Sequence, residues 1–278
     1  MDIIDAHHHL WDRSRFRYGW LASVPEIDAD FLLLDYVEST RGTGVVKSVF
    51  VQADVDAEFA LQETRWALSL AESDAAVDGV VAWAPVESGD LLGYLEKLGS
   101  HKKLKGIRRL IQGEGDDFCA RPRFVEGMRT LAKAGYSFDL CVYHSQLSAA
   151  IDLVRSVPEM AFVLDHLGKP PIRTGDMAPW AAHIRELAAL PNVQCKLSGM
   201  VTEADPKNWT PEQLRPYIHV ALEAFGPERI QFGSDWPVSL LGISYGAWID
   251  IVREAVTDLS SSEQEAFFYG NAARFYRL

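Results

Sequence analysis

The chain has 278 residues, a formal net charge of −12 and a hydrophobic fraction of 48%, which is enough apolar material for a large core. An acidic protein of this kind is not expected to bind nucleic acids or anionic membranes, because both present negative phosphates. No apolar run approaches the roughly 20 residues of a membrane span, and the three cysteines fall in no metal or disulfide spacing. We therefore expect a cytoplasmic globular protein that acts on a small molecule.

Eight short runs rich in apolar and β-branched residues recur along the chain and predict β-strands. The runs are nearly continuous rather than alternating, which is typical of parallel strands covered by helices. The predicted strands are 3–7, 47–54, 79–86, 104–111, 136–143, 160–168, 192–199 and 229–237.

Segments with helical spacing of apolar residues lie between many of these strands. In one of them Trp180, Ile184 and Leu187 repeat at helical spacing, and Pro191 follows as a breaker. The predicted helices are 58–76, 121–134, 146–157, 180–190 and 212–225, with a closing helix at 262–276 after the eighth strand.

Eight strand-then-helix units in this length predict a distorted (β/α)₈ barrel of the α/β class, with residues 1–278 forming a single domain. The other arrangement would be an open doubly wound sheet, but no glycine-rich phosphate loop follows the first strand. Active sites of barrels lie at the carboxyl ends of the strands. The polar residues at those ends are therefore the candidates for function.

Groups able to do chemistry stand at nearly every predicted strand end. The segment DAHHHLWD brings His7 and His9 to the end of the first strand, while His8 should point away because side chains alternate. A lone histidine at a strand end is more often structural. The indication of a functional site is therefore that polar side chains stand at the ends of many strands. The other strand-end candidates are Gln52, Asp54, Trp83, Glu87, Arg108, Arg109, Gln112, Tyr143, His144, Asp165, His166, Lys196, Ser198, Ser234, Asp235 and Trp236.

The motifs DAHHHLWD, FVQAD, GIRRLIQ, LDHLGKP, KLSG, FGSDWPV and NAARFYRL together resemble the amidohydrolase superfamily over residues 3–278. Within it they are similar to the branch of sugar lactonases that includes fuconolactonases and rhamnonolactonases. The resemblance implies a (β/α)₈ fold and hydrolysis of esters, lactones, amides or phosphoesters, commonly with one or two divalent metals. By motif, His7 and His9 match the strand-one pair, His166 matches the strand-six histidine, and Asp235 matches the strand-eight aspartate.

The resemblance does not decide whether this protein binds a metal ion. Members with two metals carry a bridging carboxylated lysine on strand four or five, and Lys105 lies at the wrong end of its strand for that role. At most one divalent ion, such as Zn²⁺, is therefore expected, and some lactonases of this branch work without a metal. The expected ligands are His7, His9 and Asp235, with His144 or His166 as a further one.

Opening a lactone requires an activated water, stabilisation of the oxyanion and a proton for the departing alkoxide. We expect Asp235 to take the proton from water and later return it to the alkoxide. A Zn²⁺ ion would polarise the carbonyl; without one, the strand-one histidines, His166 and Arg108 would donate hydrogen bonds to it. The motif match, rather than strand phase, favours Arg108 over Arg109.

Aromatic and neutral polar side chains near the predicted mouth favour a neutral sugar 1,4- or 1,5-lactone as the substrate. Only two arginines end the strands, fewer than a dicarboxylate or phosphorylated substrate would need. The expected activity is the hydrolysis of an aldonolactone to its sugar acid, as in the catabolism of sugars such as L-fucose and L-rhamnose. Trp20 is also expected near this mouth, where aromatic faces suit sugar rings, and the polar strand ends, Asp54 and Asp165 among them, could bind several hydroxyls. The residues expected to bind the substrate are His7, His9, Trp11, Gln52, Trp83, Gln112, Tyr143, His144 and Trp236.

Two other functions stay open. Related members of the superfamily use the same histidines and aspartate for the metal-dependent, non-oxidative decarboxylation of aromatic acids, which carbon dioxide release from a benzoate-type acid would reveal. A non-catalytic sugar-binding barrel would instead keep its ligand affinity after the loss of Asp235. The oligomeric state is not indicated by any pattern in the sequence.

Overall fold

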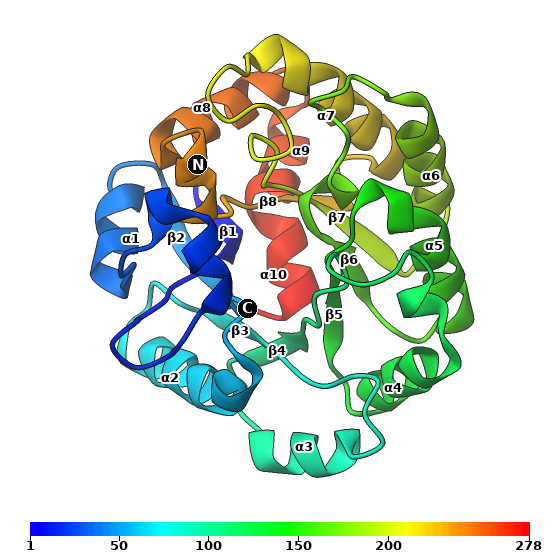
Figure 1. Cartoon of the computed structure of the whole chain (residues 1–278). Coiled ribbons are helices and arrows are strands. Elements are labelled where there is room, and N and C mark those ends of the chain that lie inside the picture. The colour runs from blue at the N-terminus through cyan, green and yellow to red at the C-terminus, as the bar shows by residue number, and fades with distance from the viewer.

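The computed structural model describes residues 1–278, and its centre is a sheet of eight parallel strands in chain order (Figure 1). The sheet closes into a barrel where His8, at the end of the first strand, pairs with Trp236 just beyond the last. The expected (β/α)₈ fold is thereby confirmed. The strands are β1 Ile3–His8, β2 Val45–Val51, β3 Gly79–Ala82, β4 Leu104–Ile107, β5 Ser137–Leu140, β6 Phe162–Leu164, β7 Val193–Leu197 and β8 Ile230–Phe232.

Helices surround the barrel and cover the outer faces of the strands (Figure 1). Five of them match predicted segments, and α1, α3 and α8 are additional. None combines the length and the apolar character that crossing a membrane requires. The helices of this ring are α1 Leu33–Thr40, α2 Ala60–Ser73, α3 Leu91–Leu98, α4 Pro122–Lys133, α5 Leu147–Ser156, α6 Ala178–Ala188, α7 Pro211–Phe225 and α8 Tyr245–Ala255.

Local sequence signals explain where these helices begin and end, as α7 illustrates. Thr210 precedes the helix, and its backbone N–H donates to the Gln213 side chain at 2.9 Å, while Pro211 occupies the first helical turn. Gly226 ends the helix with a φ of 67°, a conformation that glycine adopts without a steric penalty.

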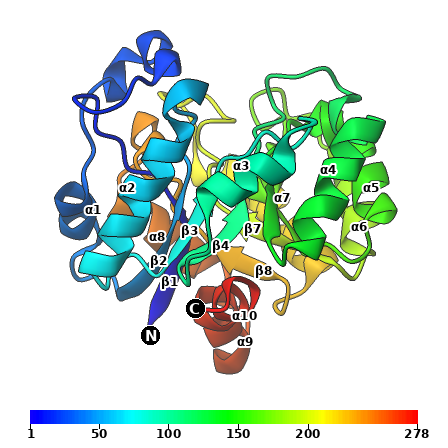
Figure 2. The ribbon, with the colours of Figure 1, turned by 90° about the horizontal axis from the view of Figure 1, so that it is seen from below.

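The predicted closing helix over 262–276 consists of three successive helical pieces. These are α9 Ser261–Glu265, a π-helical turn Ala266–Gly270 and α10 Asn271–Tyr276. The last piece covers the amino-terminal end of the barrel (Figure 2), where Phe275 and Tyr276 pack against apolar side chains of the strands. With this end covered, the carboxyl ends of the strands are left as the open face.

Candidate active site

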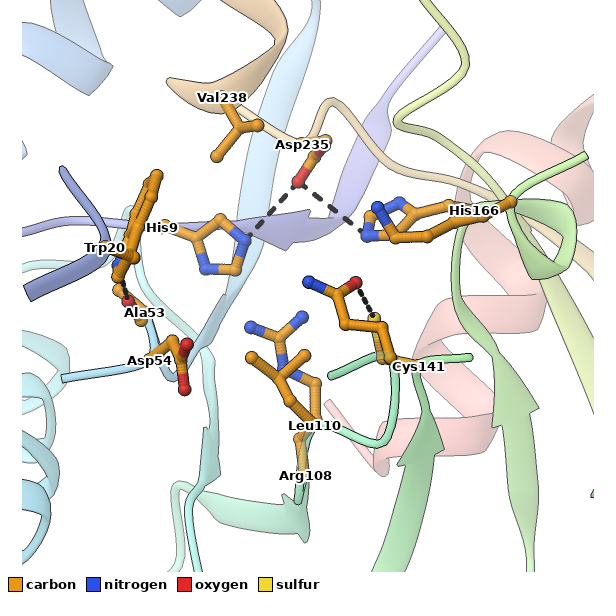
Figure 3. A pocket seen from close by; sticks show the side chains of 12 residues that line it. His9, Trp20, Ala53, Asp54, Arg108, Leu110, Cys141, His166, Asp235 and Val238 are labelled. Carbon is orange, nitrogen blue, oxygen red and sulfur yellow. Dashed lines mark hydrogen bonds and ion pairs between the residues drawn. The ribbon is translucent and has the colours of Figure 1, made fainter. Parts of the chain in front are cut away.

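A pocket opens among the loops that follow the carboxyl ends of the strands (Figure 3). It encloses about 160 Å³, less than the roughly 300–1,000 Å³ of pockets that hold drug-sized ligands. Its size therefore suits a small molecule. The lining residues are His9, Trp20, Ala53, Asp54, Arg108, Leu110, Gln112, Cys141, His166, Lys169, Asp235 and Val238.

Three histidines and one aspartate converge at the floor of this pocket, where His9, His166 and Asp235 line it and His7 is buried behind them. The Nε2 atoms of His7 and His9 lie 3.2 Å apart. The Oδ1 atom of Asp235 lies 3.4 Å from His9 Nε2, 3.7 Å from His7 Nε2 and 3.8 Å from His166 Nε2. Figure 3 shows His9 and His166 on opposite sides of Asp235, each facing its carboxylate. Strands β1, β6 and β8 thus bring their ends to one point, and we name this group the open centre.

Alternation along β1 separates the three consecutive histidines. His7 and His9 face the interior of the barrel, whereas His8 lies on the other side of the strand. There its ring stacks on Tyr36 with 4.0 Å between centroids, and its Nε2 atom lies 2.9 Å from Ser48 Oγ. Burial lowers the pKa of His8 to about 3. His8 therefore packs as a neutral side chain between the barrel and α1.

The open centre is rich in hydrogen-bond acceptors. His9 Nδ1 lies 2.7 Å from the carbonyl oxygen of Val51, and because a carbonyl only accepts, this nitrogen carries the hydrogen. In the neutral ring, Nε2 then presents a lone pair toward the carboxylate of Asp235 and toward His7. A cation, either a metal ion or a shared proton, is needed between these groups to offset their repulsion.

Burial and charge determine the protonation of the centre. Burial lowers the pKa of His166 to about 4 and that of His7 well below its usual value, so both are neutral near pH 7. Burial would raise the pKa of Asp235, but His166, His9 and His7 together outweigh it and hold this pKa below its usual value. Neutral imidazoles beside an ionised carboxylate form a donor set that suits a divalent metal.

A second charged cluster lies directly beneath, inside the barrel. The ammonium group of Lys196 lies 2.5 Å from Asp139 Oδ2, 3.0 Å from Asp165 Oδ1 and 3.2 Å from His7 Nδ1. Tyr276 of α10 donates to the same Asp139 oxygen at 2.8 Å. These groups are fully buried, and Lys196 already provides a cation that contacts both carboxylates. We name them the closed cluster, and His7 belongs to both groups through its two ring nitrogens.

The two consecutive arginines of GIRRLIQ have different surroundings. Arg108 lines the pocket, with Nη1 at 3.4 Å from His7 Nε2 and 3.5 Å from Asp165 Oδ2, and it donates through Nη2 to the carbonyl oxygen of Gln52. Arg109 points elsewhere and pairs with Glu87 at 2.9 Å and Glu114 at 2.6 Å. Only Arg108 can therefore reach a molecule bound in the pocket.

Four pocket residues have backbones in the left-handed region, which costs a non-glycine residue about 1–2 kcal/mol. Their φ angles are 54° for Asp54, 54° for His166, 48° for Lys169 and 57° for Asp235. Such outliers concentrate at functional sites, where the surrounding structure compensates for the strain. A close approach also requires Gly199, since a Cβ atom there would lie 2.4 Å from His166 Nδ1 and 2.9 Å from Asp235 Oδ2.

A buried carboxylate fastens β1 to the loop after β8 and thereby positions the centre. Asp5 accepts hydrogen bonds from the backbone N–H of Ser234 at 2.9 Å and from its hydroxyl at 2.6 Å. The hydroxyls of Tyr36 and Tyr245 each donate to it at 3.0 Å. Since Ser234 precedes Asp235, these bonds determine where the catalytic candidate lies relative to His7. The sequence had indicated no role for Asp5, although it opens the DAHHHLWD motif.

Some of the remaining predicted site residues line the pocket, and others lie behind it or at its edge. Gln112 lines the pocket and accepts from Cys141 Sγ at 3.5 Å. Gln52 is buried behind the pocket, and its Oε1 accepts from the backbone of Asp54 at 2.6 Å. Tyr143 is exposed and its ring lies 5.5 Å from Lys169 Nζ.

Three tryptophans and His144 lie outside the lining. Trp11 and Trp236 are fully buried, and Phe31 packs edge-on against both rings. Trp83 is half-buried and packs edge-on against Tyr94. His144 begins the helical turn before α5 and belongs to none of the groups that could hold a metal. Trp20 and Lys169 do line the pocket, and Lys169 could have been singled out from its position in the LDHLGKP motif.

The whole chain is similar to proteins of one known family. The sequence model of the Amidohydrolase family matches residues 4–278. The chain is 35% identical to an L-fucono-1,5-lactonase of Burkholderia ambifaria, over 99% of this chain and 95% of that protein. It is 26% identical to an L-rhamnono-gamma-lactonase of Scheffersomyces stipitis, over 70% of this chain and 66% of that protein. The crystal structure of an amidohydrolase from Burkholderia multivorans with bound zinc superposes with a TM-score of 0.92 and 34% identity, and both chains are fully covered.

Proposed function

Since the chain belongs to the amidohydrolase family, we propose that it hydrolyses a neutral sugar 1,4- or 1,5-lactone to the corresponding sugar acid. The single observation that carries this proposal is the open centre, where an ionised carboxylate and three imidazoles converge at the floor of a small pocket. The similarity to proteins named as fuconolactonase and rhamnonolactonase supports the choice of substrate.

In the proposed mechanism, Asp235 moves the protons. Its carboxylate lies at the pocket floor, where it accepts a proton from a water molecule that attacks the lactone carbonyl. The bond from carbon to the ring oxygen then breaks, and Asp235 returns the proton to the departing alkoxide. The two transfers balance, so the enzyme ends in its starting protonation state.

The oxyanion that forms during the attack is stabilised by donors on the opposite side of the pocket. Arg108 is buried and positively charged, and its Nη1 atom lies 3.4 Å from His7 Nε2, next to the centre. Arginine N–H groups fixed in a site with little water stabilise such charge strongly, because they need no reorganisation during the reaction. If no metal is bound, His166 would be a further donor through Nε2, because its Nδ1 lies 2.9 Å from Ser198 Oγ.

The open centre also fits one divalent ion, which we propose to be zinc. Four of the six separations among the ligand atoms of His7, His9, His166 and Asp235 are 3.2–3.8 Å, and those of His7, His166 and Asp235 all lie within 4.8 Å of one another. Nitrogen and oxygen atoms this close together would suit one divalent ion. When bound, such an ion polarises the carbonyl and lowers the pKa of a bound water. A second ion would conflict with Lys196, whose ammonium group already lies between Asp139 and Asp165. The proposed ligands are His7, Asp235 and either His9 or His166, which leaves one position of the ion for a water molecule.

The test is a pH-indicator screen of aldonolactones, each with and without a chelator. We expect acid release from at least one neutral sugar lactone and a slower rate after chelation. A parallel assay follows carbon dioxide release from benzoate-type acids. If the aldonolactones show no rate above background while an aromatic acid loses carbon dioxide, the protein is a decarboxylase and the proposal fails.

A further inference from the structure

Asp54 is the one charged residue of the pocket whose side chain has no partner in the protein. Asp235 faces the histidines, Arg108 lies near Asp165, and Lys169 pairs with Glu203 at 2.9 Å. Asp54 lines the pocket, yet its carboxylate makes neither a hydrogen bond nor an ion pair, and only its backbone N–H is engaged. Both of its oxygens are therefore free to accept hydrogen bonds from a ligand.

Neighbouring carboxylates differ from Asp54 in this respect. Asp56 accepts from the backbone N–H of Gly19 at 2.9 Å and pairs with Arg17. Glu63 is buried behind the same loop and accepts from the backbone N–H of Ala53 at 3.3 Å. The free carboxylate is therefore particular to the position that faces the pocket.

The backbone around Asp54 is held on both sides, so the side chain is presented in a defined direction. Its N–H donates to Gln52 Oε1 at 2.6 Å, and the carbonyl oxygen of Ala53 accepts from Trp20 Nε1 at 2.9 Å. These bonds maintain a left-handed φ of 54°, which costs a non-glycine residue about 1–2 kcal/mol. A strained residue that is held in place and faces a pocket points to a role in binding.

The wall that carries Asp54 combines two kinds of contact. Figure 3 shows Trp20 and Asp54 next to each other, on the His9 side of the pocket. Trp20 is half-buried, and Trp11 packs edge-on against its ring with 5.4 Å between centroids. An aromatic face supports the apolar face of a sugar ring, and a carboxylate accepts hydrogen bonds from hydroxyls.

We infer that Asp54 is a specificity-determining residue that accepts hydrogen bonds from the hydroxyl groups of the substrate ring while Trp20 supports the face of that ring. This inference rests on the proposed lactonase function and deepens it. A carboxylate accepts but does not donate, so the wall selects neutral lactones that carry hydroxyls. It also repels lactones that carry a carboxylate or a phosphate of their own.

The test compares two six-membered lactones that differ in their hydroxyls, glucono-1,5-lactone and the unsubstituted δ-valerolactone. Asp54→Ala is expected to lower kcat/KM for the hydroxylated lactone about 10- to 100-fold, the usual worth of hydrogen bonds to a charged group. The rate with δ-valerolactone should stay within about twofold of wild type, because this lactone carries no hydroxyl for the Asp54 carboxylate to bind. Asp54→Asn should also reduce the difference in kcat/KM between a neutral aldonolactone and one that carries a carboxylate.

Glu58→Gln is the matched control. Glu58 lies in the same loop as Asp54, but its carboxylate pairs with Arg17 outside the pocket. This variant should behave as wild type with both lactones. Equal losses with both lactones in Asp54→Ala would show a general role in folding or catalysis and would overturn the inference. Unchanged rates with both would overturn it too.

A binding measurement separates this inference from the proposed function. Tryptophan fluorescence can follow binding of an unreactive hydroxylated six-membered lactam to wild type and Asp54→Ala. We expect the variant to bind about tenfold more weakly, whether or not the protein opens lactones. Equal affinities would overturn the role of Asp54 even if the wild type proves to be a lactonase. The absence of lactone hydrolysis together with weaker lactam binding would overturn only the proposed function.

Discussion

The open centre and the closed cluster contain similar groups but differ in what balances their charge. In the closed cluster, Lys196 lies between Asp139 and Asp165 and is fully buried, so the protein itself provides the cation. In the open centre, Asp235 and the histidines face a pocket, and no lysine lies between them. Under the proposed function, acidic residues serve stability in the lower layer of the barrel and chemistry in its upper layer.

His7 connects the two groups. Its Nδ1 atom lies 3.2 Å from Asp165 Oδ1, while its Nε2 atom faces His9 and Asp235. Burial would raise the pKa of Asp165, but Lys196 and His7 outweigh it and hold this pKa well below its usual value. An ionised Asp165 accepts the Nδ1 hydrogen of His7 and so leaves the Nε2 lone pair directed to the open centre. The closed cluster thus orients a residue of the open one.

The largest effect is expected for Asp235→Asn, which changes the open centre alone. Asparagine keeps the size and tolerates the left-handed backbone at this position, but it cannot accept a proton from water. We expect kcat for a neutral sugar lactone to fall on the order of 10³-fold or more, with an unchanged circular dichroism spectrum. Asp258→Asn, at an exposed carboxylate without an ion pair, should be indistinguishable from wild type. A folded Asp235→Asn variant that retains more than about a tenth of wild-type kcat would remove this residue from the mechanism.

Lys196→Met should have the next largest effect and should act on stability. The variant leaves Asp139 and Asp165 buried without their cation, which typically costs about 3–5 kcal/mol. Urea denaturation followed by circular dichroism measures the loss. Lys207→Met serves as the control because this lysine is exposed and forms no ion pair. Equal stability of the two variants would contradict the view that the closed cluster stabilises the fold.

The two adjacent arginines provide a third test of the comparison. Arg108→Gln removes a buried charge beside the open centre and is expected to lower kcat about 100-fold, as the loss of an oxyanion donor does. Arg109→Gln removes only the ion pairs with Glu87 and Glu114, which are worth about 1 kcal/mol or less near the surface. Steady-state kinetics of both variants on one lactone measures which arginine contributes to kcat. A larger loss of kcat in Arg109→Gln would reverse the assignment.

Gly199→Ala is expected to have the smallest of these effects on activity, and Gly226→Ala is its control. Both glycines have a positive φ, so both variants should lose about 1–2 kcal/mol of stability from backbone strain. Only the Cβ atom at position 199 would meet His166 and Asp235, whereas nothing lies within 4 Å at position 226. We therefore expect a roughly tenfold loss of kcat in Gly199→Ala alone, because misplaced catalytic groups are costly. Equal activities of the two variants would show that this contact does not position the centre.

The sequence predicts the open centre better than its surroundings. His7, His9, His166 and Asp235 lie within three residues of the carboxyl ends of β1, β6 and β8, and a parallel barrel brings all strand ends to one rim, so their convergence follows from the strand pattern. The sequence also predicts Trp20 and Asp54 near the mouth, but not that they form one wall, which depends on a hydrogen bond between residues 33 positions apart and on a left-handed backbone. Neither feature leaves a periodic signal in the chain.

In the fold, too, some elements were predicted from the sequence and others were not. All eight strands were predicted, because continuous apolar runs are a strong signal. The helices α1 and α3, each of eight residues, were not among the predicted segments, since short helices give little periodicity. The closing helix was predicted, but its π-helical turn over Ala266–Gly270 was not, because nothing in the apolar spacing distinguishes it from an α-helix.

The most direct test of the central claim is the hydrolysis of a neutral sugar lactone by metal-depleted protein to which zinc is added stepwise. The account predicts that acid release rises with zinc up to one equivalent per chain and then stays constant, because the closed cluster already holds Lys196. A rate that keeps rising to two equivalents would contradict the closed cluster. Full activity without zinc would contradict the metal at the open centre, and no acid release at any zinc content would contradict the lactonase itself.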